Sequence, residues 1–465
     1  MNVIRRKAKF CYMYRTSCST VVKVIALTSC FLLFYSFIAG ISLFSSNNDS
    51  YEAYLNVDGP YQNDEKVPNN KVESVQSVLK RHERYDVHDG NVPVAKNLKD
   101  IGNDLDVDED EEDDSGDDKQ KNNKVEVIPS TYPNATLRRQ NMAKCNPIHG
   151  KIAVFVAYRK EEYDQKYKIA QETIRCYIKS TDYQLHLVDM FNDPEVNYYC
   201  NHTEVFFRKH CAAAVYLKKS DWMLVLDADT AVVNPNHCIE EYIDDRVDLL
   251  FYERYFNWEI MSGNYLVRNT DFGRDFLMKW ANFEYTKPNS WNGADNGVLQ
   301  IHIMHTVLPN SVNEKNTCYK LWTNATSYDT YLAYVTCVKV NLGAQRLYPG
   351  KLRILRRGHG FARDGFLAYD SYCEHDFMFH GYKQNEIGEK KWESPFETPV
   401  DLSKCNNSFD GWNWRKKKQL SCPKIQKIIA SFERHTAKNY PKEGQVFPHL
   451  ALPDVGECWP NCEHD

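Results

Sequence analysis

The sequence predicts an α/β protein in which a Rossmann-like, mostly parallel sheet carries helices on both faces. From about residue 150, short runs rich in β-branched and aromatic residues alternate with amphipathic helical segments, as in βαβ units. Two aspartates directly follow one of the apolar runs, where strands of such a sheet present ligand-binding groups. An uncharged stretch of 21 residues near the N-terminus places this sheet behind a predicted transmembrane helix.

The uncharged stretch, Val24 to Phe44, has about the length that spans a bilayer as a helix. Six lysines and arginines precede it within the predicted cytosolic tail, residues 1–23, and positive charge stays on the cytosolic side. We therefore expect a single-pass type II membrane protein of the Golgi or ER, with its body in the lumen. The alternative is a cleaved signal peptide, which the small residues Ala39 and Gly40 would permit.

Residues 45–147 are polar and lack sustained apolar periodicity, so we expect a flexible acidic stem there. Eleven acidic residues lie in 104–118, where a solvated segment is the simplest interpretation and calcium binding or partner docking is the alternative. A folded lumenal domain, 148–455, and a C-terminal tail, 456–465, follow. The formal net charge is −5, and the chain is balanced once the acidic run and the basic N-terminus are set aside. No nucleic-acid partner is expected.

Twelve of the 15 cysteines lie between Cys145 and Cys462, and an even number in an oxidising lumen is typical of disulfides. Their pairing cannot be read from the spacing. Zinc binding by Cys458 and Cys462 is the alternative, but no second pair with ligand spacing accompanies them. N-glycosylation acceptor motifs begin at Asn134, Asn201, Asn324 and Asn406.

The expected elements follow one another from residue 151. Periodicity and turn residues predict strands at 151–157, 183–188, 222–226, 248–252 and 263–269. The same criteria predict helices at 162–180, 203–219, 238–243, 271–285 and 295–307. The region from residue 351 is expected to be loop-rich, and its basic patch at 415–418 is interpreted as surface or as a substrate contact.

Asp227 and Asp229 are the first candidate functional residues. The buried strand Trp222 to Leu226 delivers both carboxylates to its carboxyl end, where they can hold one divalent cation. Other Asp-x-Asp triplets occur at 104–110, but no apolar strand precedes them. Burying two carboxylates costs several kcal/mol unless a metal or donors neutralise them. We expect Asp229 to bind Mn²⁺ or Mg²⁺ directly, and Asp227 to bind it through water or to contact a ribose.

His380 and Lys383 are candidates because they follow the aromatic run Phe377 to Phe379. His380 could complete the metal shell, Gly381 permits close backbone approach, and Lys383 could meet phosphates. A histidine satisfied within the core is the simpler alternative.

Four further residues are weaker candidates. Asp295 and Asn296 stand at a predicted helix start, where a catalytic role and plain helix capping are both open. Asn264 and Arg268 could line a pocket for a donor sugar, although Arg268 could instead form a structural ion pair.

These blocks resemble the Golgi α-galactosyl/xylosyltransferases of fungal mannan and plant xyloglucan synthesis. The chain is more similar still to an uncharacterised, nematode-expanded group of putative nucleotide-diphospho-sugar transferases. The resemblance covers roughly residues 150 to 385, and only the Asp-Ala-Asp block is highly specific. It rests on 206–243, on Gly263 to Asn269 followed by 275–280, on Asp295-Asn296 and on His380-Gly381.

The resemblance implies the A-type glycosyltransferase fold, a metal-dependent nucleotide-sugar donor and retention of anomeric configuration. It also implies that Asp227, Asp229 and His380 bind the metal, and that Asp295 and Asn296 have a donor-binding or catalytic role. The chain departs from the family pattern at Asn264, where Ala is common, and at Asn296, which follows Asp295 where the family often has Gln. These departures bear on the sugar and the mechanism more than on the fold.

The predicted function is therefore transfer of a sugar from a nucleotide diphosphate, with a uridine-linked donor favoured, to a glycan or glycoprotein acceptor. A phosphatase of the haloacid dehalogenase type also uses a strand ending in Asp-x-Asp, but Ala231 stands where that class has Thr or Val. A non-catalytic lumenal protein that binds a sugar nucleotide or a glycan is the main alternative. It would require loss of a ligand, and all candidate ligands are present.

Overall fold

The computed structural model describes residues 145 and 147–439 without 256, 388–393 and 406–408, together with 450, 454–456, 459 and 460. The predicted cytosolic tail, membrane span and nearly all of the stem lie outside these residues. Cys458 and Cys462 lie outside them as well, as do the acceptor motifs at Asn134 and Asn406. Within the described part, no helix combines the length and apolarity needed to cross a bilayer.

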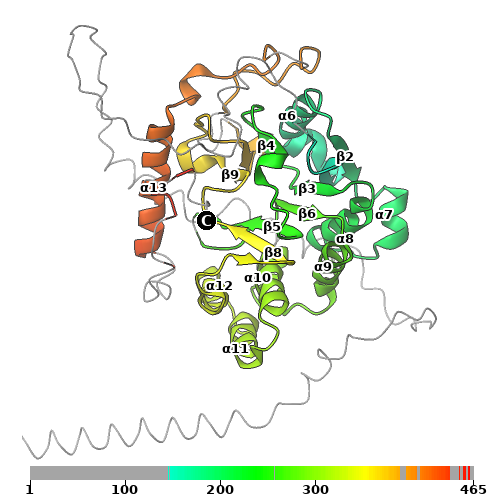
Figure 1. The fold of residues 1–465 in the computed structure, drawn as a ribbon, viewed down its shortest axis with the longest axis vertical. Coiled ribbons are helices and arrows are strands. Elements are labelled where there is room, and N and C mark those ends of the chain that lie inside the picture. The colour runs from blue at the N-terminus through cyan, green and yellow to red at the C-terminus, as the bar shows by residue number, and fades with distance from the viewer. Residues whose placement is uncertain are drawn as a thin grey trace, which may run out of the picture. The chain divides into compact units, whose positions relative to one another are not determined.

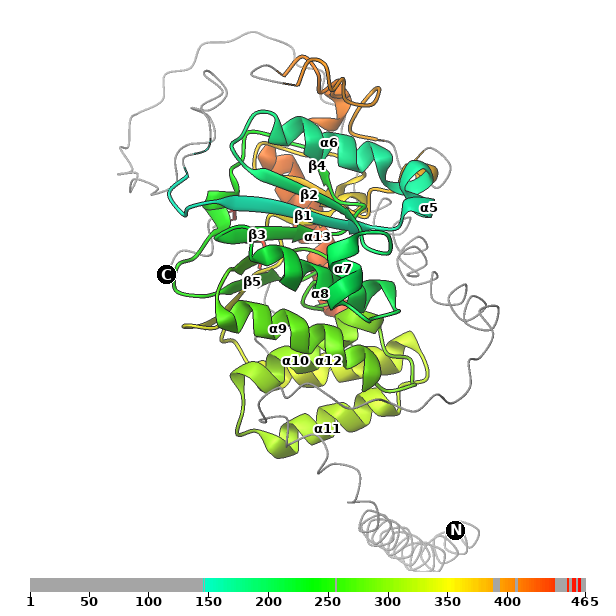
Figure 2. The same cartoon turned by 90° about the vertical axis from the view of Figure 1, so that its right-hand side faces the viewer.

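A seven-stranded sheet in the order β2-β1-β3-β6-β5-β8-β7 forms the centre of the fold (Figures 1 and 2). β1 pairs in parallel with β2 and β3, and β5 pairs in parallel with β8, whereas β6 and β7 run antiparallel to their neighbours. The mixed α/β fold with a mostly parallel sheet is thereby confirmed. The strands are β1 Ile152–Tyr158, β2 Gln184–Asp189, β3 Trp222–Leu226, β5 Leu249–Tyr252, β6 Tyr265–Arg268, β7 Leu347–Tyr348 and β8 Leu352–Leu355.

Two hydrophobic cores lie on opposite faces of this sheet because successive side chains of a strand alternate between its faces. Phe155 of β1 belongs to one core, and its neighbours Val154 and Val156 belong to the other. The first core is closed by α8 Val205–Leu217, α9 Asp271–Asn282, α10 Ala294–Val307 and α12 Tyr328–Leu342. The second is closed by α6 Lys168–Ile178 and by a smaller sheet of β4 Ala231–Val232, β10 Met378–His380 and β9 Ala362–Asp364.

Several elements differ from the expected ones. The expected helix at 162–180 is three pieces: α5 Lys160–Glu162, a π-helical turn at Tyr163–Tyr167, and α6. The segment expected to be loop-rich contains β8, β9, β10 and α13 Cys422–Asn439, so that expectation is wrong in part. The short helix at 238–243 and the end of the helix at 271–285 are 3₁₀ turns, at Ile239–Tyr242 and Phe283–Tyr285.

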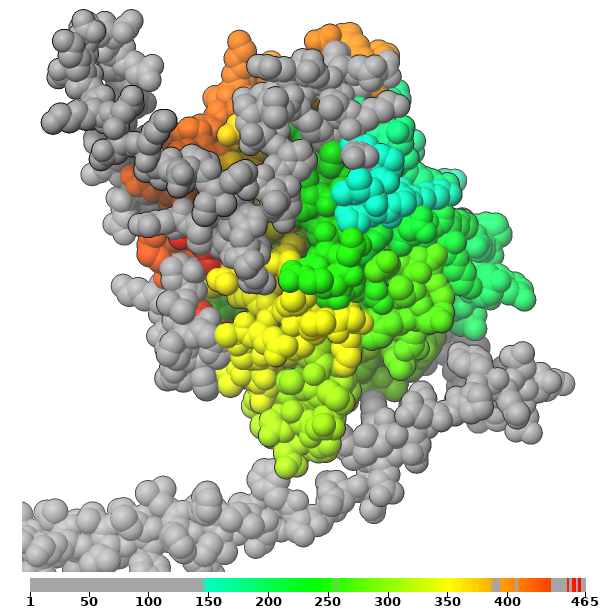
Figure 3. Space-filling view, in the orientation of Figure 1, coloured from blue at the N-terminus to red at the C-terminus, as the bar shows by residue number. Residues whose placement is uncertain are grey.

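α7 Pro194–Tyr199, α11 Val312–Thr323 and α12 have no counterpart among the expected elements. α12 is rich in aromatic and β-branched residues, which favour strands by intrinsic preference. Packing overrides that preference, since α12 lies against α10 and α11 and Ser327 caps its start by accepting a hydrogen bond from the Thr330 N–H. Figure 3 shows α11 and α12 side by side in the lower part of the described domain.

Disulfides pair every cysteine that the structure describes, as the even count predicted. Cys176–Cys405 attaches the segment before residue 406 to α6, and Cys373–Cys422 attaches the start of α13. Of the acceptor motifs, Asn201 and Asn324 are described and both are exposed. The remaining disulfides are Cys145–Cys238, Cys200–Cys211 and Cys318–Cys337.

His302 makes stability depend on pH. Its ring packs on Phe276 of α9 at 4.0 Å, and its Nε2 lies 3.0 Å from the Phe276 carbonyl oxygen. Burial lowers the pKa of His302 to about 3, against the opposing effect of that hydrogen bond. The imidazole is therefore neutral in the folded protein, whereas in the unfolded chain it binds a proton below the ordinary histidine pKa of 6.5.

The free energy of unfolding is consequently expected to fall as the pH is lowered from 6.5 towards 3, with about 1.4 kcal/mol per pH unit due to His302. In His302→Gln the amide can still donate to the Phe276 carbonyl but does not titrate. Denaturant unfolding at pH 7, 6, 5 and 4 should therefore show a shallower acid-side decline in the variant. Parallel curves for the two proteins would contradict this assignment.

Candidate functional site

Asp227 and Asp229 lie at the carboxyl end of β3, as the sequence predicted. All five residues of β3 are buried, and the strand lies between β1 and β6. The turn beyond it is held from two directions. The Gln171 side chain of α6 donates to the Ala228 carbonyl at 2.6 Å, and the Tyr382 N–H donates to the Asp229 carbonyl at 2.7 Å. Main-chain contacts thus fix where both carboxylates project.

Asp227 is ionised next to a lysine. Lys209 Nζ from α8 lies 2.8 Å from Asp227 Oδ1. Burial raises the pKa of Asp227, but Lys209 and His380 together hold it well below its usual range. Gly263 is required behind this carboxylate, because a Cβ there would lie 2.1 Å from Asp227 Oδ2.

His380 ends β10 and points between the two aspartates. Its Nε2 lies 3.4 Å from Asp227 Oδ2 and 3.6 Å from Asp229 Oδ1. That nitrogen is buried and has no hydrogen-bond partner within the described part of the chain. Burial lowers the pKa of His380, and the carboxylates of Asp229, Asp227 and Asp364 raise it, to about 10.

These three side chains fit a divalent cation. Each offers one ligand atom, and the atoms all lie within 4.8 Å of one another. Carboxylate oxygens with one imidazole nitrogen suit Mn²⁺, and carboxylates suit Mg²⁺. The other nitrogen of His380, Nδ1, lies 2.8 Å from Asp364 Oδ1, an arrangement that fixes the tautomer of a metal-binding histidine. The buried Nε2, which faces both carboxylates without a hydrogen bond to either, is the observation that supports the fit most directly.

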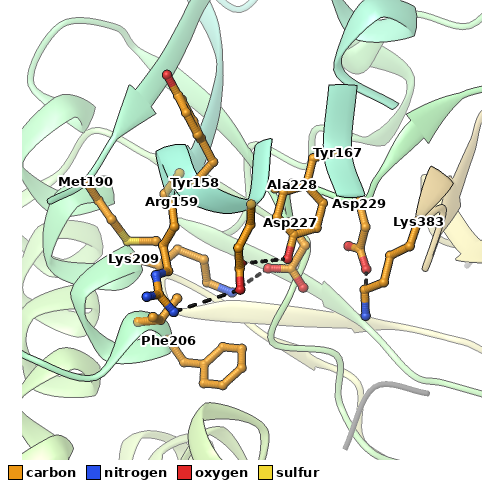
Figure 4. Close-up of a pocket in the computed structure, with 13 residues that line it drawn as sticks. Tyr158, Arg159, Tyr167, Met190, Phe206, Lys209, Asp227, Ala228, Asp229 and Lys383 are labelled. Atoms are coloured by element: carbon orange, nitrogen blue, oxygen red, sulfur yellow. Dashed lines mark hydrogen bonds and ion pairs between the residues drawn. The ribbon is translucent and has the colours of Figure 1, made fainter. Parts of the chain in front are cut away.

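A cleft opens over these carboxylates (Figure 4). The end of β1 and the turn after it supply one wall, through Tyr158, Glu162 and Tyr167. The start of α8 supplies another, through Phe206 and Lys209. The strand-end aspartates lie at its base, and Lys383 lines it beside them. Lys383 Nζ is 3.5 Å from Asp229 Oδ2, so the ammonium group of Lys383 lies next to this carboxylate in the cleft.

Asp295 is near the cluster and does not cap its helix. Gly293, with φ +64°, is the N-cap of α10. The Asp295 carboxylate instead lies 3.3 Å from Lys209 Nζ and 3.0 Å from His210 Nε2. Burial raises its pKa, but Lys209 and His210 outweigh burial and lower it. The interpretation of Asp295 as the cap of this helix is therefore wrong. Its ionised carboxylate shares the ammonium group of Lys209 with the carboxylate of Asp227.

His210 is held as the neutral tautomer with a proton on Nε2. Burial and the nearby Lys209 lower its pKa to about 4. An ionised Asp295 can only accept, so Nε2–H donates to it, and Nδ1 accepts from the Tyr265 hydroxyl at 3.0 Å. This chain of hydrogen bonds fixes the orientation of the Asp295 carboxylate.

The structure does not bring the other two donor-site candidates into the cleft. Arg268 pairs with Trp222 at the amino end of β3, the end opposite to the aspartates, because β6 runs antiparallel to β3. Asn264 is fully buried, and its Oδ1 accepts from the Asp227 N–H at 3.0 Å. Asn264 therefore supports the strand end from behind. Asn296 accepts from the Ser262 N–H at 3.2 Å.

Two residues of this site were missed in the sequence. Lys209 stands in a helix whose residues 207–217 are all buried, so a lysine within an apolar helical run was the available signal. Asp364 lies in a segment interpreted as loop and is placed by the parallel pairing of β9 with β10. No local pattern marks it.

Asp364→Asn is expected to weaken Mn²⁺ binding by about 10- to 100-fold, the usual effect of removing the carboxylate that orients a metal-binding histidine. Mn²⁺ titration followed by electron paramagnetic resonance measures this without any substrate. Asp401→Asn, in an exposed turn where Asp401 bonds Ser403, is the matched control and should bind like the wild type. Equal affinities of Asp364→Asn and wild type would remove Asp364 from the site.

Comparison with known proteins gives a partial match. Residues 174–394 match a family described as "Protein of unknown function, DUF273". No curated protein matches the chain. This segment contains all the site residues that were predicted from the sequence.

Among solved structures, the chain is similar to a glycosyltransferase involved in the glycosylation of the major capsid of PBCV-1, with 15% identity and a TM-score of 0.28. That likeness covers 50% of this chain and 93% of the other. The apo-form glycosyltransferase GlyE of Streptococcus pneumoniae TIGR4 is similar with 12% identity and a TM-score of 0.25, over 43% of this chain and 65% of GlyE. At these TM-scores the geometry of the site, and not the likeness, carries a functional proposal.

Proposed function

We propose that this chain is a metal-dependent glycosyltransferase. It moves a sugar from a nucleotide-diphosphate donor, uridine-linked by preference, to a glycan or glycoprotein acceptor, with retention of configuration. One observation carries the proposal: Asp227, Asp229 and His380 meet at the carboxyl end of β3, and the two aspartates lie at the base of a cleft that Lys383 also lines. In open α/β sheets, ligands bind at this end of the strands.

Asp227, Asp229 and His380 would hold Mn²⁺ or Mg²⁺, and such an ion stabilises the charge of a departing diphosphate. Asp364 keeps the His380 ring oriented, since its Oδ1 lies 2.8 Å from Nδ1. Lys383 points into the cleft beside Asp229, where its ammonium group can bind a phosphate oxygen. The proposed metal site and the ammonium group of Lys383 could thus bind the same diphosphate.

Asp295 is proposed to act at the sugar. Its carboxylate is buried, ionised and oriented by His210, and it faces the metal site across Lys209. A fixed negative charge stabilises the positive charge that develops on a sugar as the donor bond breaks. Asn296, the next residue, bonds the main chain of Ser262 and would position this helix start.

The cellular setting is part of the proposal. The paired cysteines suit an oxidising compartment, in keeping with a Golgi or ER lumen and a type II anchor at Val24 to Phe44. The finer resemblance, to Golgi α-galactosyl/xylosyltransferases and the nematode-expanded group, would make the transferred sugar a hexose or a pentose.

Donor hydrolysis tests the proposal. The full-length chain, produced in a secretory host and purified, is incubated with a panel of nucleotide sugars with and without Mn²⁺ or Mg²⁺. We expect hydrolysis of one donor class that depends on the metal. Metal-dependent nucleotide binding without hydrolysis would favour the non-catalytic binding protein instead. Absence of both hydrolysis and metal-dependent binding would overturn the proposal.

A further inference from the structure

The helix that follows β1 is interrupted beside the cleft. A π-helical turn, Tyr163–Tyr167, separates α5 from α6. Glu162, just before this turn, and Tyr167, its last residue, both line the cleft, and the Tyr167 hydroxyl donates to Glu162 Oε2 at 3.2 Å. π-helical turns are uncommon and concentrate at functional sites. The shape of the turn therefore sets the position of the wall opposite the aspartates.

The side-chain amide of Gln384 is inserted between the backbone of this turn and the backbone at the start of α6. Its Nε2 donates to the Asp164 carbonyl at 2.6 Å, and its Oε1 accepts from the Ile169 N–H at 2.9 Å. Asp164 and Ile169 are five residues apart, the spacing that a π-helical hydrogen bond would join directly. Insertion of a side chain into a helical ladder is an established cause of helix distortion. A primary amide suits the position because it donates and accepts at once.

The residues before Gln384 are attached to the other side of the cleft. The Tyr382 N–H donates to the Asp229 carbonyl at 2.7 Å, and Lys383 Nζ lies 3.5 Å from the Asp229 carboxylate. Gly381, with φ +78°, allows the chain to turn after His380 and reach these contacts. Three successive residues thus join Asp229 to the π-helical turn.

We propose that Gln384 is a positioning residue that holds the wall formed by the π-helical turn at a set distance from Asp229. The ligand whose binding depends on this distance is a nucleoside diphosphate, since the cleft lies between the turn and the proposed metal site. The identity of that ligand rests on the proposed function. The two hydrogen bonds of Gln384 are observed in the structure and do not depend on that function.

Gln384→Ala and Gln384→Glu test the inference. Alanine removes both hydrogen bonds, and a glutamate carboxylate can accept from Ile169 but cannot donate to the Asp164 carbonyl. Uridine diphosphate binding in the presence of Mn²⁺ is measured by calorimetry, and KM and kcat of donor hydrolysis are measured separately. Both variants should weaken nucleotide binding and raise the donor KM by about tenfold, with kcat within about threefold of wild type. Asn385→Ala, at the exposed next position, should match the wild type.

The outcomes separate this inference from the function on which it rests. If the wild type binds no nucleotide, the proposed function fails. If the wild type binds and both variants bind equally well, or if kcat falls while KM stays constant, the positioning role is overturned. Should alanine prevent folding, Gln384→Met keeps the side-chain volume without the amide and is measured in the same way.

Discussion

Asp229→Asn is expected to reduce metal-dependent donor hydrolysis by about a thousandfold while secretion and folding stay close to normal. The proposed metal ion would supply several kcal/mol of stabilisation to the leaving diphosphate, and a thousandfold change in rate corresponds to about 4 kcal/mol. The amide is nearly isosteric with the carboxylate but is a poor ligand. The backbone at this residue is held independently, because its carbonyl accepts from the Tyr382 N–H.

The measurement compares hydrolysis, Mn²⁺ affinity and the melting temperature of the variant with those of wild type. Asp221→Asn is the matched control, since Asp221 precedes the same strand at its opposite end and accepts from the Lys151 N–H at 2.7 Å, as an amide oxygen also can. The control should retain full activity. Retained hydrolysis in Asp229→Asn would remove the metal-site assignment, and with it the main support for the enzyme.

Lys209→Met is expected to lower the free energy of unfolding by about 3–5 kcal/mol, as in other cases where one partner of a buried ionic group is removed. Lys209 is 4% exposed and contacts both Asp227 and Asp295. Methionine retains most of the volume but leaves two buried carboxylates without the cation between them. Both acids should then bind protons more readily, so the loss should be smaller at low pH.

Chemical denaturation measures the effect, and Lys218→Met on the exposed end of the same helix should change stability by less than about 0.5 kcal/mol. In a Lys209→Met/Asp295→Asn double variant, removal of one carboxylate should restore part of the loss. If Lys209→Met unfolds like the wild type, the charge arrangement described for the site is incorrect.

The parts of the site that could be predicted are those with a local signal. Asp227 and Asp229 follow a strand of five apolar residues, so the strand and its two carboxylates form one continuous pattern in the sequence. His380 likewise ends a short buried strand that begins with Met378 and Phe379. In both cases the functional side chains directly follow or end the strand that presents them. The apolar pattern of that strand is therefore sufficient to locate them in the sequence.

The parts that could not be predicted depend on contacts between distant segments. Asp364 meets His380 only because β9 and β10 pair, and Gln384 meets Ile169 across 215 residues of chain. Arg268 shows that the direction of a strand is also difficult to predict from its sequence. A four-residue apolar strand has the same pattern whether it runs parallel or antiparallel, so nothing local showed that Arg268 would lie at the far end of β3.

By itself, then, the sequence determined the α/β class, the strand that ends in Asp227 and Asp229, and the even set of cysteines from Cys145 onward. These follow from side-chain period, burial of apolar residues and composition, which act over a few residues. Only the tertiary structure decided that Lys209 neutralises two carboxylates, that Asp364 orients His380, and that Arg268 lies away from the cleft. Such outcomes depend on the order and direction of the strands. These are selected by the packing of both cores together, and no single segment encodes them.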